Sequence, residues 1–245
     1  MSNNYMLLYG KNSIKERLRN YPESVKKIFF ADNFKSPDIE KLIEIKKIPT
    51  ERLPLRKIEN MKRAKNVQGI VARVEPFAYA EFADLLDTGK KSKSCLVFLD
   101  RINDPQNLGI ILRTLACFGN FYVVIPENEA CEITDAVMHV ASGGENYVRV
   151  ARIKDFPKAI ACARDKGFFV IGAVPSIEAK DICDTRFSFP LAIILGSEAK
   201  GISPELFDLV DAQIKISMPG AGLSLNVSMA CAIFAHEIVK QRGQL

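Results

Sequence analysis

Two glycine-bearing loops in the last third of the chain carry the residues best suited to chemistry. The first, 196–201 (GSEAKG), follows the apolar run 191–195, and the second, 219–222 (PGAG), follows a predicted strand at 212–218. A short apolar run closed by glycine is typical of a buried strand that feeds a tight loop. Loops at the ends of strands are where α/β sheets bind ligands, so these segments predict a ligand site.

Neither loop has a common nucleotide-binding pattern. Gly196 and Gly201 have the separation of a phosphate-binding P-loop, but Lys200 precedes the second glycine and Ile202 follows it, and no GxGxxG follows a strand. Glu198 also disfavours bound phosphate. The loops better suit a ligand read by backbone groups, with a ribose or an amine near the carboxylate. Taken singly, either loop is better explained as a simple turn.

Arg113 is a third candidate, on a predicted helix that follows the loop 100–109 and runs to about residue 118. Its neighbours Ile110, Ile111, Leu112 and Leu115 are apolar, and an arginine in such a helix needs a partner or a function. The structural alternative is an ion pair with Asp100 or Asp104.

The back half alternates predicted strands and helices around these residues. This alternation indicates a mainly parallel sheet with helices on both faces. A further glycine loop, 141–145 (ASGGE), precedes a short strand. The predicted strands are 95–99, 121–125, 148–150, 168–174, 191–195 and 212–218; the helices are 109–118, 133–140, 156–165, a short one opened by Ser203 and Pro204, and 223–240.

The front half forms a separate, smaller α/β module in this interpretation. Its predicted helices are 12–19 and 38–46, and its strands are 25–30 and 69–74. The stretch 77–94 ends in TGKKSKS, loses hydrophobicity and is expected to be a linker. The expected domains are therefore 1–76 and 95–245.

Charge divides the chain in the same place. Residues 1–93 carry 20 Lys and Arg against 12 Asp and Glu, whereas residues 94–245 carry 14 against 17. The densest basic patch is 52–65, with six basic residues and one acid, Glu59. A basic front half suggests that this half meets a polyanion, although a solvated basic face would look the same.

The six cysteines, two histidines and apolar runs exclude several classes. The cysteines form no CxxC pair, so buried reduced thiols are expected rather than disulfides, and with two histidines no metal site is expected. No apolar run approaches the ~20 residues that span a bilayer, and the start lacks a signal peptide. The expected location is the cytoplasm.

Three blocks together resemble the SpoU (TrmH-like) branch of the SPOUT RNA methyltransferases. Residues 104–113 (DPQNLGIILR) match the family's N-x-G-x-x-x-R through Asn107, Gly109 and Arg113. Residues 195–202 (LGSEAKGI) match G-x-E-x-x-G. Residues 216–230 (ISMPGAGLSLNVSMA) match I-P-M-x-G-x-x-x-S-L-N-V-S-x-A, with Ser217 in place of proline.

The front half resembles the family's amino-terminal substrate-binding domain. The matching stretches are 9–14 (YGKNSI) and 66–72 (NVQGIVA), where Val67 stands in place of the usual histidine. Proteins with this layout look most like the bacterial 23S rRNA guanosine 2′-O-methyltransferases, and relatives act on other rRNA or tRNA sites.

The resemblance implies a trefoil knot in the back domain, a homodimer packed through the knot region and S-adenosylmethionine as cofactor. By motif position, the cofactor-binding residues are Gly196, Gly201, Ile216, Met218 and Leu225. No membrane and no metal are implied.

The same resemblance implies the catalytic residues. Arg113 takes the proton-handling role in the family proposal, but a guanidinium is a poor base, and it could instead stabilise a developing oxyanion. Asn107 and Asn226 orient the groups, and Glu198 and Ser224 support the loops. Gly109, one turn before Arg113, is expected to leave room for RNA.

The expected function is S-adenosylmethionine-dependent 2′-O-methylation of a guanosine ribose in 23S rRNA. A tRNA ribose 2′-O-methyltransferase is the first alternative. A non-catalytic RNA-binding or ribosome-assembly module is the second, and it is disfavoured because all five proposed catalytic residues are present.

Overall fold

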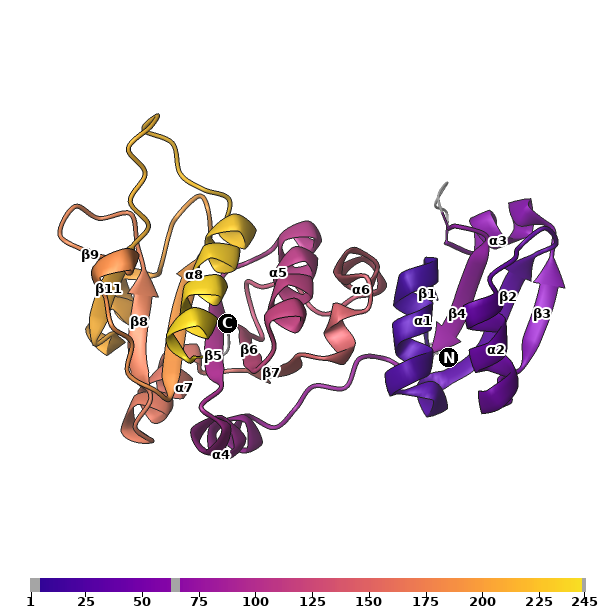
Figure 1. The fold of residues 1–245 in the computed structure, drawn as a ribbon, viewed down its shortest axis with the longest axis horizontal. Helices are drawn as coiled ribbons and strands as arrows, with labels where there is room; N and C mark the ends of the chain where they lie inside the picture. Colours follow the sequence, from indigo (N-terminus) through magenta and orange to yellow (C-terminus); the bar gives the residue numbers. More distant parts are fainter. Residues whose placement is uncertain (1–4, 63–66, 244–245) are drawn as a thin grey trace.

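Two sheets, one in each half of the chain, organise the molecule into two lobes (Figure 1). This computed structural model describes residues 5–62 and 67–243. Four strands in the order β1-β4-β2-β3 form the first sheet, and seven in the order β7-β6-β5-β10-β8-β11-β9 form the second. The strands are β1 Met6–Tyr9, β2 Val25–Ala31, β3 Thr50–Leu53, β4 Ile70–Val74, β5 Cys95–Asp100, β6 Phe121–Pro126, β7 Arg149–Ile153, β8 Phe169–Ala173, β9 Lys180–Asp181, β10 Leu191–Gly196 and β11 Ala212–Lys215.

The first lobe is a small mixed sheet with helices. β4 pairs antiparallel with β1 and β2, and β3 pairs parallel with β2. Its helices are α1 Lys11–Asn20, α2 Pro37–Lys46 and α3 Leu55–Lys62, with a 3-10 turn, η1, at Pro22–Ser24. All four elements predicted here are confirmed to within one residue at each end. β1, β3 and α3 were missed; the two strands have only four residues each and one buried position between them, too few to show an alternating pattern.

The second lobe is the parallel sheet that the sequence predicted. All of its neighbouring strands run parallel. Successive residues of β5 face opposite sides, so Val97 and Leu99 pack in one core cluster while Leu96 and Phe98 pack in the other. Burial on both faces explains why these strands appear in the sequence as continuous apolar runs.

Helices cover the two faces of this sheet. α5 Pro105–Phe118, α6 Asp135–Ala141 and α8 Val227–Gln241 contribute to the cluster around Val97, and α4 Phe82–Ser92 and α7 Phe156–Asp165 contribute to the cluster around Phe98. Three 3-10 turns complete the lobe: η2 Gly144–Asn146, η3 Ile182–Asp184 and η4 Pro204–Leu209.

The stretch expected to be a linker, 77–94, contains helix α4. Leu85 and Leu86 are buried, and both belong to the core cluster that includes Phe98 and Phe168. The sequence prediction missed α4 because the stretch has few apolar residues. A few are enough to attach a helix to a core when they lie on one face of it. Most of this stretch thus belongs structurally to the second lobe.

Three boundaries near the glycine loops also differ from the predictions. α5 begins at Pro105 rather than near Gly109, and Asp104 caps it by accepting a hydrogen bond from the Gln106 amide at 2.9 Å. β11 ends at Lys215, and α8 begins at Val227 instead of residue 223. Residues 216–226 therefore form an irregular return segment from the sheet edge to α8, in the region where the resemblance places the knot.

Candidate active site

A cavity opens at the carboxyl ends of β8, β10 and β11, where the two glycine loops meet. Its walls include residues of the 196–201 loop, the 216–226 return segment and the first turns of α8. The lining residues are Ala173, Val174, Pro175, Leu195, Gly196, Ser197, Glu198, Gly201, Ile214, Ile216, Met218, Ser224, Leu225, Val227, Ala230 and Phe234. Most are apolar or can offer only backbone groups, and Glu198 is the sole charged side chain in the set.

All five residues predicted to bind a cofactor line this cavity, together with two of the predicted catalytic residues, Glu198 and Ser224. The motif blocks that contribute them are far apart in sequence. The fold brings the two later blocks together because β10 and β11 both end at this edge of the sheet, on either side of β8.

Residue 196 must be glycine because its loop folds too tightly to leave room for a side chain. A Cβ atom at this position would lie 2.1 Å from the carbonyl carbon of Gly201. The Gly201 amide donates to the Ser197 carbonyl at 2.8 Å, which closes the loop. Any side chain at residue 196 would force this loop open and change the cavity wall.

A polar network ties the loop to two helices through the carboxylate of Glu198. Its Oε1 accepts hydrogen bonds from Asn107 Nδ2 at 3.1 Å, from the Val227 amide at 3.3 Å and from Asn226 Nδ2. Asn226 Nδ2 also donates to Asn107 Oδ1 at 2.9 Å. Three of the predicted catalytic residues, Asn107, Glu198 and Asn226, therefore form one contact group.

Asn226 has a second task that explains where α8 begins. Its Oδ1 accepts from the Ser228 amide at 2.8 Å, which caps the helix. Because Nδ2 is held by Glu198 and Asn107, the cap also fixes α8 relative to the 196–201 loop.

A second brace, which the sequence did not predict, holds the other end of this loop. Asp100, at the end of β5, is 4% exposed and accepts from the Ser203 amide at 2.6 Å and the Ser203 hydroxyl at 2.8 Å. Arg101 donates to Asp100 at 3.2 Å and to the Gly201 carbonyl at 3.3 Å. Ser203, predicted to cap the following helix, makes no side-chain cap. The sequence did contain one indication of this brace, since Asp100 directly follows the apolar residues of β5.

A second hollow adjoins the first and shares Ser197, Glu198 and Val227 with it. Arg101, Asn103, Asp104, Asn107 and Lys200 also line it. It has more charged side chains than the first cavity: Arg101 and Lys200 are basic, and Asp104, Glu129 and Glu198 are acidic. The Glu198 network thus separates an apolar hollow from a polar one, which suits two different ligands.

Arg113 lies apart from both hollows. Its side chain is exposed on α5, and neither cavity includes it. Within residues 5–62 and 67–243 no ion pair joins it to Asp100 or Asp104, so the structural alternative is wrong: Asp100 is engaged by Arg101 and Ser203, and Asp104 caps α5. An exposed guanidinium needs no buried partner.

Gly109 does not leave room for RNA, contrary to expectation. A Cβ atom here would lie 2.6 Å from the Cβ of Val140 and 2.9 Å from the Val137 carbonyl oxygen. The glycine instead allows α6 to pack closely on α5.

The two departures from the family pattern have structural explanations. Val67 is 1% exposed in the core of the first lobe, so this position is a packing site. Ser217 donates a hydrogen bond to Asp181, and this bond is the main cause that holds the pKa of Asp181 below its usual value.

Comparison with known proteins agrees with this geometry. The model of the SpoU rRNA methylase family matches residues 94–236, and a model for RNA 2′-O ribose methyltransferase substrate binding matches residues 7–80. A protein of Staphylococcus epidermidis whose name places it in the TrmH family of tRNA/rRNA methyltransferases is 32% identical over 245 residues, covering 98% of this chain and 97% of the relative.

The chain belongs to the SpoU rRNA methylase family. Another relative, named YacO of Bacillus subtilis and also assigned by name to TrmH-type tRNA/rRNA methyltransferases, is 30% identical over 99% of this chain and 98% of its own length. Residues from the three family motifs therefore contact one another in this structure. The clearest case is the hydrogen-bonded group of Asn107, Glu198 and Asn226.

Solved structures share the fold over nearly the whole chain. The SpoU methyltransferase AviRb of Streptomyces viridochromogenes, in complex with the cofactor AdoMet, has a TM-score of 0.81 at 19% identity, covering 99% of this chain and 92% of that one. An AdoMet-bound rRNA methyltransferase of Sinorhizobium meliloti has a TM-score of 0.79 at 22% identity, covering 99% and 88%. At this identity, the likeness establishes the SPOUT fold.

Residues 5–62 and 67–243 contain neither a membrane-spanning helix nor a cluster of metal ligands. No helix there is long and apolar enough to span a bilayer. No group of three or more His, Cys, Asp or Glu side chains there is arranged to hold a metal ion.

Proposed function

We propose that this chain transfers a methyl group from S-adenosylmethionine to the 2′-hydroxyl of a guanosine ribose in 23S rRNA. The observation that supports it most is the joining of Asn107, Glu198 and Asn226 in one network between an apolar and a polar hollow. In this proposal residues 1–76 bind RNA, and residues 95–245 carry out the transfer in the cytoplasm.

The chemistry of the first cavity fits the proposed cofactor. Val174, Ile214 and Phe234 offer apolar surface for a flat ring, and the chain at Gly196, Ile216 and Leu225 offers backbone donors and acceptors. Glu198 supplies a carboxylate, which suits ribose hydroxyls or a cation. When bound, S-adenosylmethionine supplies a methyl group already activated by a positively charged sulfur. Met218 closes one side, and Ser224 and Gly201 complete the walls.

The polar hollow suits the substrate ribose. Asn103 and Asn107 can donate to or accept from ribose oxygens, and the acids Asp104, Glu129 and Glu198 outnumber the bases Arg101 and Lys200. Asn107 is 7% exposed and held by Glu198 and Asn226. An amide fixed in this way orients a bound hydroxyl without reorganising during the reaction.

Arg113 needs a second copy of the chain if it is to reach a methyl site. We assign it stabilisation of the oxyanion that develops on the ribose 2′-oxygen, because a guanidinium remains protonated. In one copy it lies outside both hollows. A homodimer packed through the knot region would allow Arg113 of one copy to serve the site of the other.

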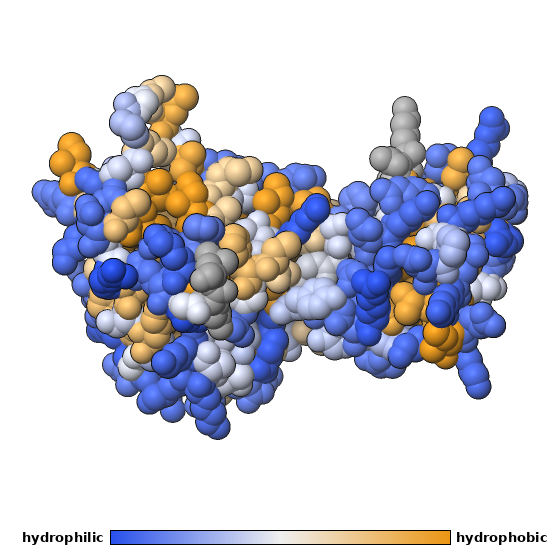
Figure 2. Space-filling model, viewed as in Figure 1, coloured by the Kyte–Doolittle hydropathy of each residue, from blue (hydrophilic) through white to orange (hydrophobic). Residues whose placement is uncertain are grey.

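The surface of the second lobe supports such a dimer. Met218 (39% exposed), Leu223 (76%), Met229 (52%) and Ile233 (38%) expose apolar side chains on the return segment and on α8. Figure 2 shows apolar residues gathered on this lobe around α8, whereas the same face of the first lobe is mostly hydrophilic. Large apolar side chains clustered on one surface are typical of an interface.

A tRNA ribose is the second candidate substrate. The names of the curated relatives cover both RNA classes, and no residue of the polar hollow distinguishes them. A non-catalytic RNA-binding module is disfavoured, because all five proposed catalytic residues are present.

The decisive experiment incubates the chain with methyl-labelled S-adenosylmethionine and either 23S rRNA or tRNA, followed by mapping of 2′-O-methyl sites. Label at one rRNA guanosine supports the proposal, and label in tRNA alone selects the alternative. Calorimetry first establishes that the cofactor binds. Bound cofactor without label in either RNA would contradict catalysis.

Mixing two inactive variants tests the shared site. Arg113→Ala lacks the proposed oxyanion group, and Gly196→Val lacks an intact cofactor loop. In a mixed dimer, the Arg113→Ala copy supplies an intact cofactor loop and the Gly196→Val copy supplies Arg113. Together they form one working site, so activity should recover on mixing. If the mixture stays inactive while mixed dimers are shown to form, Arg113 does not act across the dimer.

A further inference from the structure

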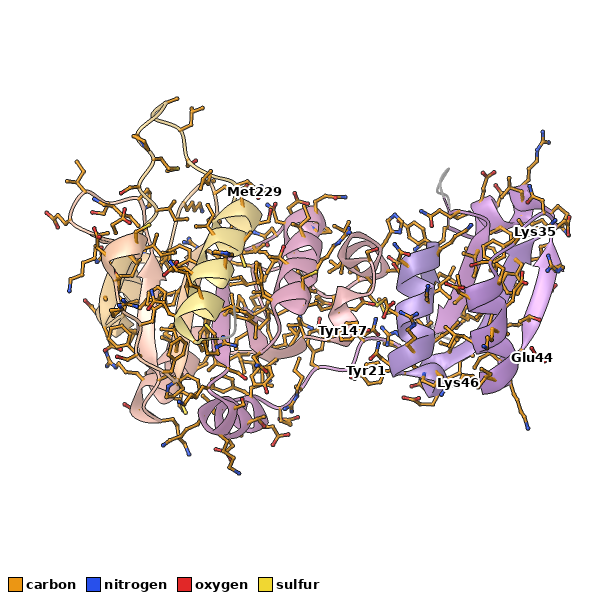
Figure 3. All side chains as sticks on the ribbon, viewed as in Figure 1. Tyr21, Lys35, Glu44, Lys46, Tyr147 and Met229 are labelled. Carbon is orange, nitrogen blue, oxygen red and sulfur yellow. The ribbon has the colours of Figure 1, made fainter. Side chains whose placement is uncertain are left out.

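The two lobes meet at a polar junction centred on Arg17 of α1 and Glu145 of η2. Only 7% of the Arg17 side chain and 0% of the Glu145 side chain are exposed, and Arg17 Nη2 lies 3.8 Å from Glu145 Oε1. Arg17 Nη2 also donates to Met138 Sδ at 3.3 Å, and the Ser13 hydroxyl donates to the Met138 carbonyl at 3.3 Å. Figure 3 shows the labelled Tyr21 and Tyr147 at this junction, and both line a hollow there with Arg17 and Glu145.

The loop that carries Glu145 is enclosed on one side by a side chain of α1 and on the other by the backbone of α5. On one side, a Cβ atom at Gly143 would lie 2.5 Å from the Cβ of Glu16 on α1. On the other side, a Cβ atom at Gly144 would lie 2.7 Å from the Cα of Arg113 on α5. The paired glycines therefore let the loop fill the space between the first lobe and the turn that carries Arg113.

Such a pair is a costly way to stabilise a junction. Arg17 Nε and Glu145 Oε2 are buried, and within the described part of the chain neither has a hydrogen-bond partner. Two buried charges lose their hydration, and an apolar pair of similar volume often stabilises a protein as well or better. In some proteins a buried charged pair instead serves specificity, because it tolerates one arrangement of the parts that it joins and penalises others.

We propose that Arg17 and Glu145 are positioning residues that hold the RNA-binding lobe in one orientation against the helix that carries Arg113. RNA captured by the first lobe would then reach the methyl site at a fixed distance and angle. This inference rests on the proposed RNA methylation, and it adds a role for residues outside both hollows.

Two variants with opposite changes in charge separate this role from simple attraction of RNA. Arg17→Met removes a positive charge, and at pH 8, where both are assayed, Glu145→Gln removes the negative charge that Glu145 carries above about pH 7. Both should raise the KM for RNA about tenfold, because a loosened lobe lowers the effective concentration of captured RNA at the methyl site. Cofactor affinity should stay within about twofold of the original, since the cavity is remote from the junction.

The matched control is Arg19→Met. Arg19 lies on the same helix, but its side chain is 50% exposed and pairs with Glu16 at 2.8 Å. The control loses the same charge as Arg17→Met, and its KM should change by less than about threefold. If Arg17→Met raised the KM and Glu145→Gln lowered it, charge alone would explain the data and the proposal would be overturned.

Hydrogen exchange tests the junction independently of activity. Amides of residues 142–147 should exchange faster in both variants and at the original rate in Arg19→Met. The double variant Arg17→Met/Glu145→Gln leaves no unpaired buried charge, and it should fold yet still show fast exchange. If the amide exchange rates of residues 142–147 were unchanged in all variants, the positioning role of Arg17 and Glu145 would be disproved, even if methylation is confirmed. Faster exchange in a chain that methylates no RNA would uphold the junction while the proposed function fails.

Discussion

Arg113 combines exposure with a position that leaves little freedom. Its Cα atom lies against Gly144, so the backbone at this turn of α5 is fixed from behind while the guanidinium projects to the surface. A charged group on a rigid base is well suited to stabilise charge that develops on a ligand, because little reorganisation is needed.

Removing this group should affect the rate and leave the fold intact. We expect Arg113→Ala to lose ~10²–10³ in single-turnover rate, which is typical for the loss of one oxyanion-stabilising donor. Arg113→Lys should recover little, because one ammonium does not reproduce the planar fork of donors. Melting temperature and cofactor affinity serve as controls. A well-folded Arg113→Ala protein with a near-normal rate would remove Arg113 from the mechanism.

At the residue scale the motifs named candidate side chains but did not predict how those side chains contact one another. Spacing in sequence predicted Asn107, Glu198 and Asn226 as separate members of three blocks. That Glu198 joins the other two is a contact across 91 and 28 residues, and no local pattern carries that information. The Asp100–Ser203 brace was missed for the same reason, since its partners are 103 residues apart.

Packing of α6 on α5 shows how one small residue positions a whole element. Two opposing effects act on Gly109→Ala. Alanine improves helix propensity by up to ~1 kcal/mol, but its Cβ would overlap Val140, and overpacking costs ~1–3 kcal/mol. We expect a net loss of about 1 kcal/mol in the free energy of unfolding, measured by denaturant titration.

Cys117→Ala is the control for Gly109→Ala, because Cys117 is exposed on the same helix. It should leave the unfolding free energy within about 0.5 kcal/mol of the original. If Gly109→Ala stabilised the chain and weakened RNA binding, Gly109 would instead serve RNA, as the sequence first suggested.

The basic segment that begins at Arg52 divides in the structure. Arg56 and Lys57 are exposed on α3, whereas Lys62 is 11% exposed and pairs with Asp135 of α6 across the junction. Arg63 and Lys65, also counted in this patch, lie outside the described residues. The patch is therefore part RNA-binding candidate and part contact between the lobes.

RNA binding at several salt concentrations distinguishes these two parts. Arg56→Ala/Lys57→Ala should weaken RNA affinity and reduce the slope of log affinity against log salt by about 1.5–2, if each contacts a phosphate. Lys62→Ala should change the salt slope by less than about 0.5 and should speed amide exchange at α6. An unchanged slope in the first variant would show that α3 is only a solvated face.

Elements were predicted best where burial alone decides them. β5 and β10 are buried along their length, and their apolar runs were sufficient. α8 was predicted four residues too early because Leu223 and Leu225 extend its apolar residues toward the amino terminus. The helix begins at Val227 because Asn226 caps it and Glu198 binds Asn226. The cap is a local contact, whereas the contact with Glu198 is tertiary.

The relative placement of the lobes is the feature furthest from the sequence. Tyr9 and His139 stack with ring centroids 3.9 Å apart and planes 15° apart, and His139 Nδ1 lies 3.2 Å from the Tyr9 carbonyl. Together with Lys62–Asp135 and Arg17–Glu145, these contacts join residues far apart in the chain. The sequence predicted only that Gly143 and Gly144 lie in a loop. Their close packing against Glu16 and Arg113 depends on how the two lobes are placed, which no local pattern predicts.

The junction should also make the stability of the whole molecule depend on pH. Burial raises the pKa of Glu145 to about 7 from an ordinary value of 4.5, although Arg17 and a hydrogen bond from Asn146 oppose the shift. The guanidinium of Arg17 remains charged at these pH values, so Glu145 is the group that titrates. The native chain holds this proton up to about pH 7, whereas the unfolded chain releases it near 4.5.

The sign follows from which state holds the proton. Because the native state binds it more tightly, the stabilisation is fully present below about pH 4.5 and is lost as pH rises to about 7. Glu145→Gln has no such group. The unfolding free energy of the original chain, minus that of Glu145→Gln, should therefore fall by about 1–3 kcal/mol between pH 4.5 and pH 8. Other titrating groups are common to both proteins and cancel in this difference. Two stability curves that run parallel across this range would mean that Glu145 is charged in the folded chain throughout, and that the junction is hydrated well enough to carry both charges.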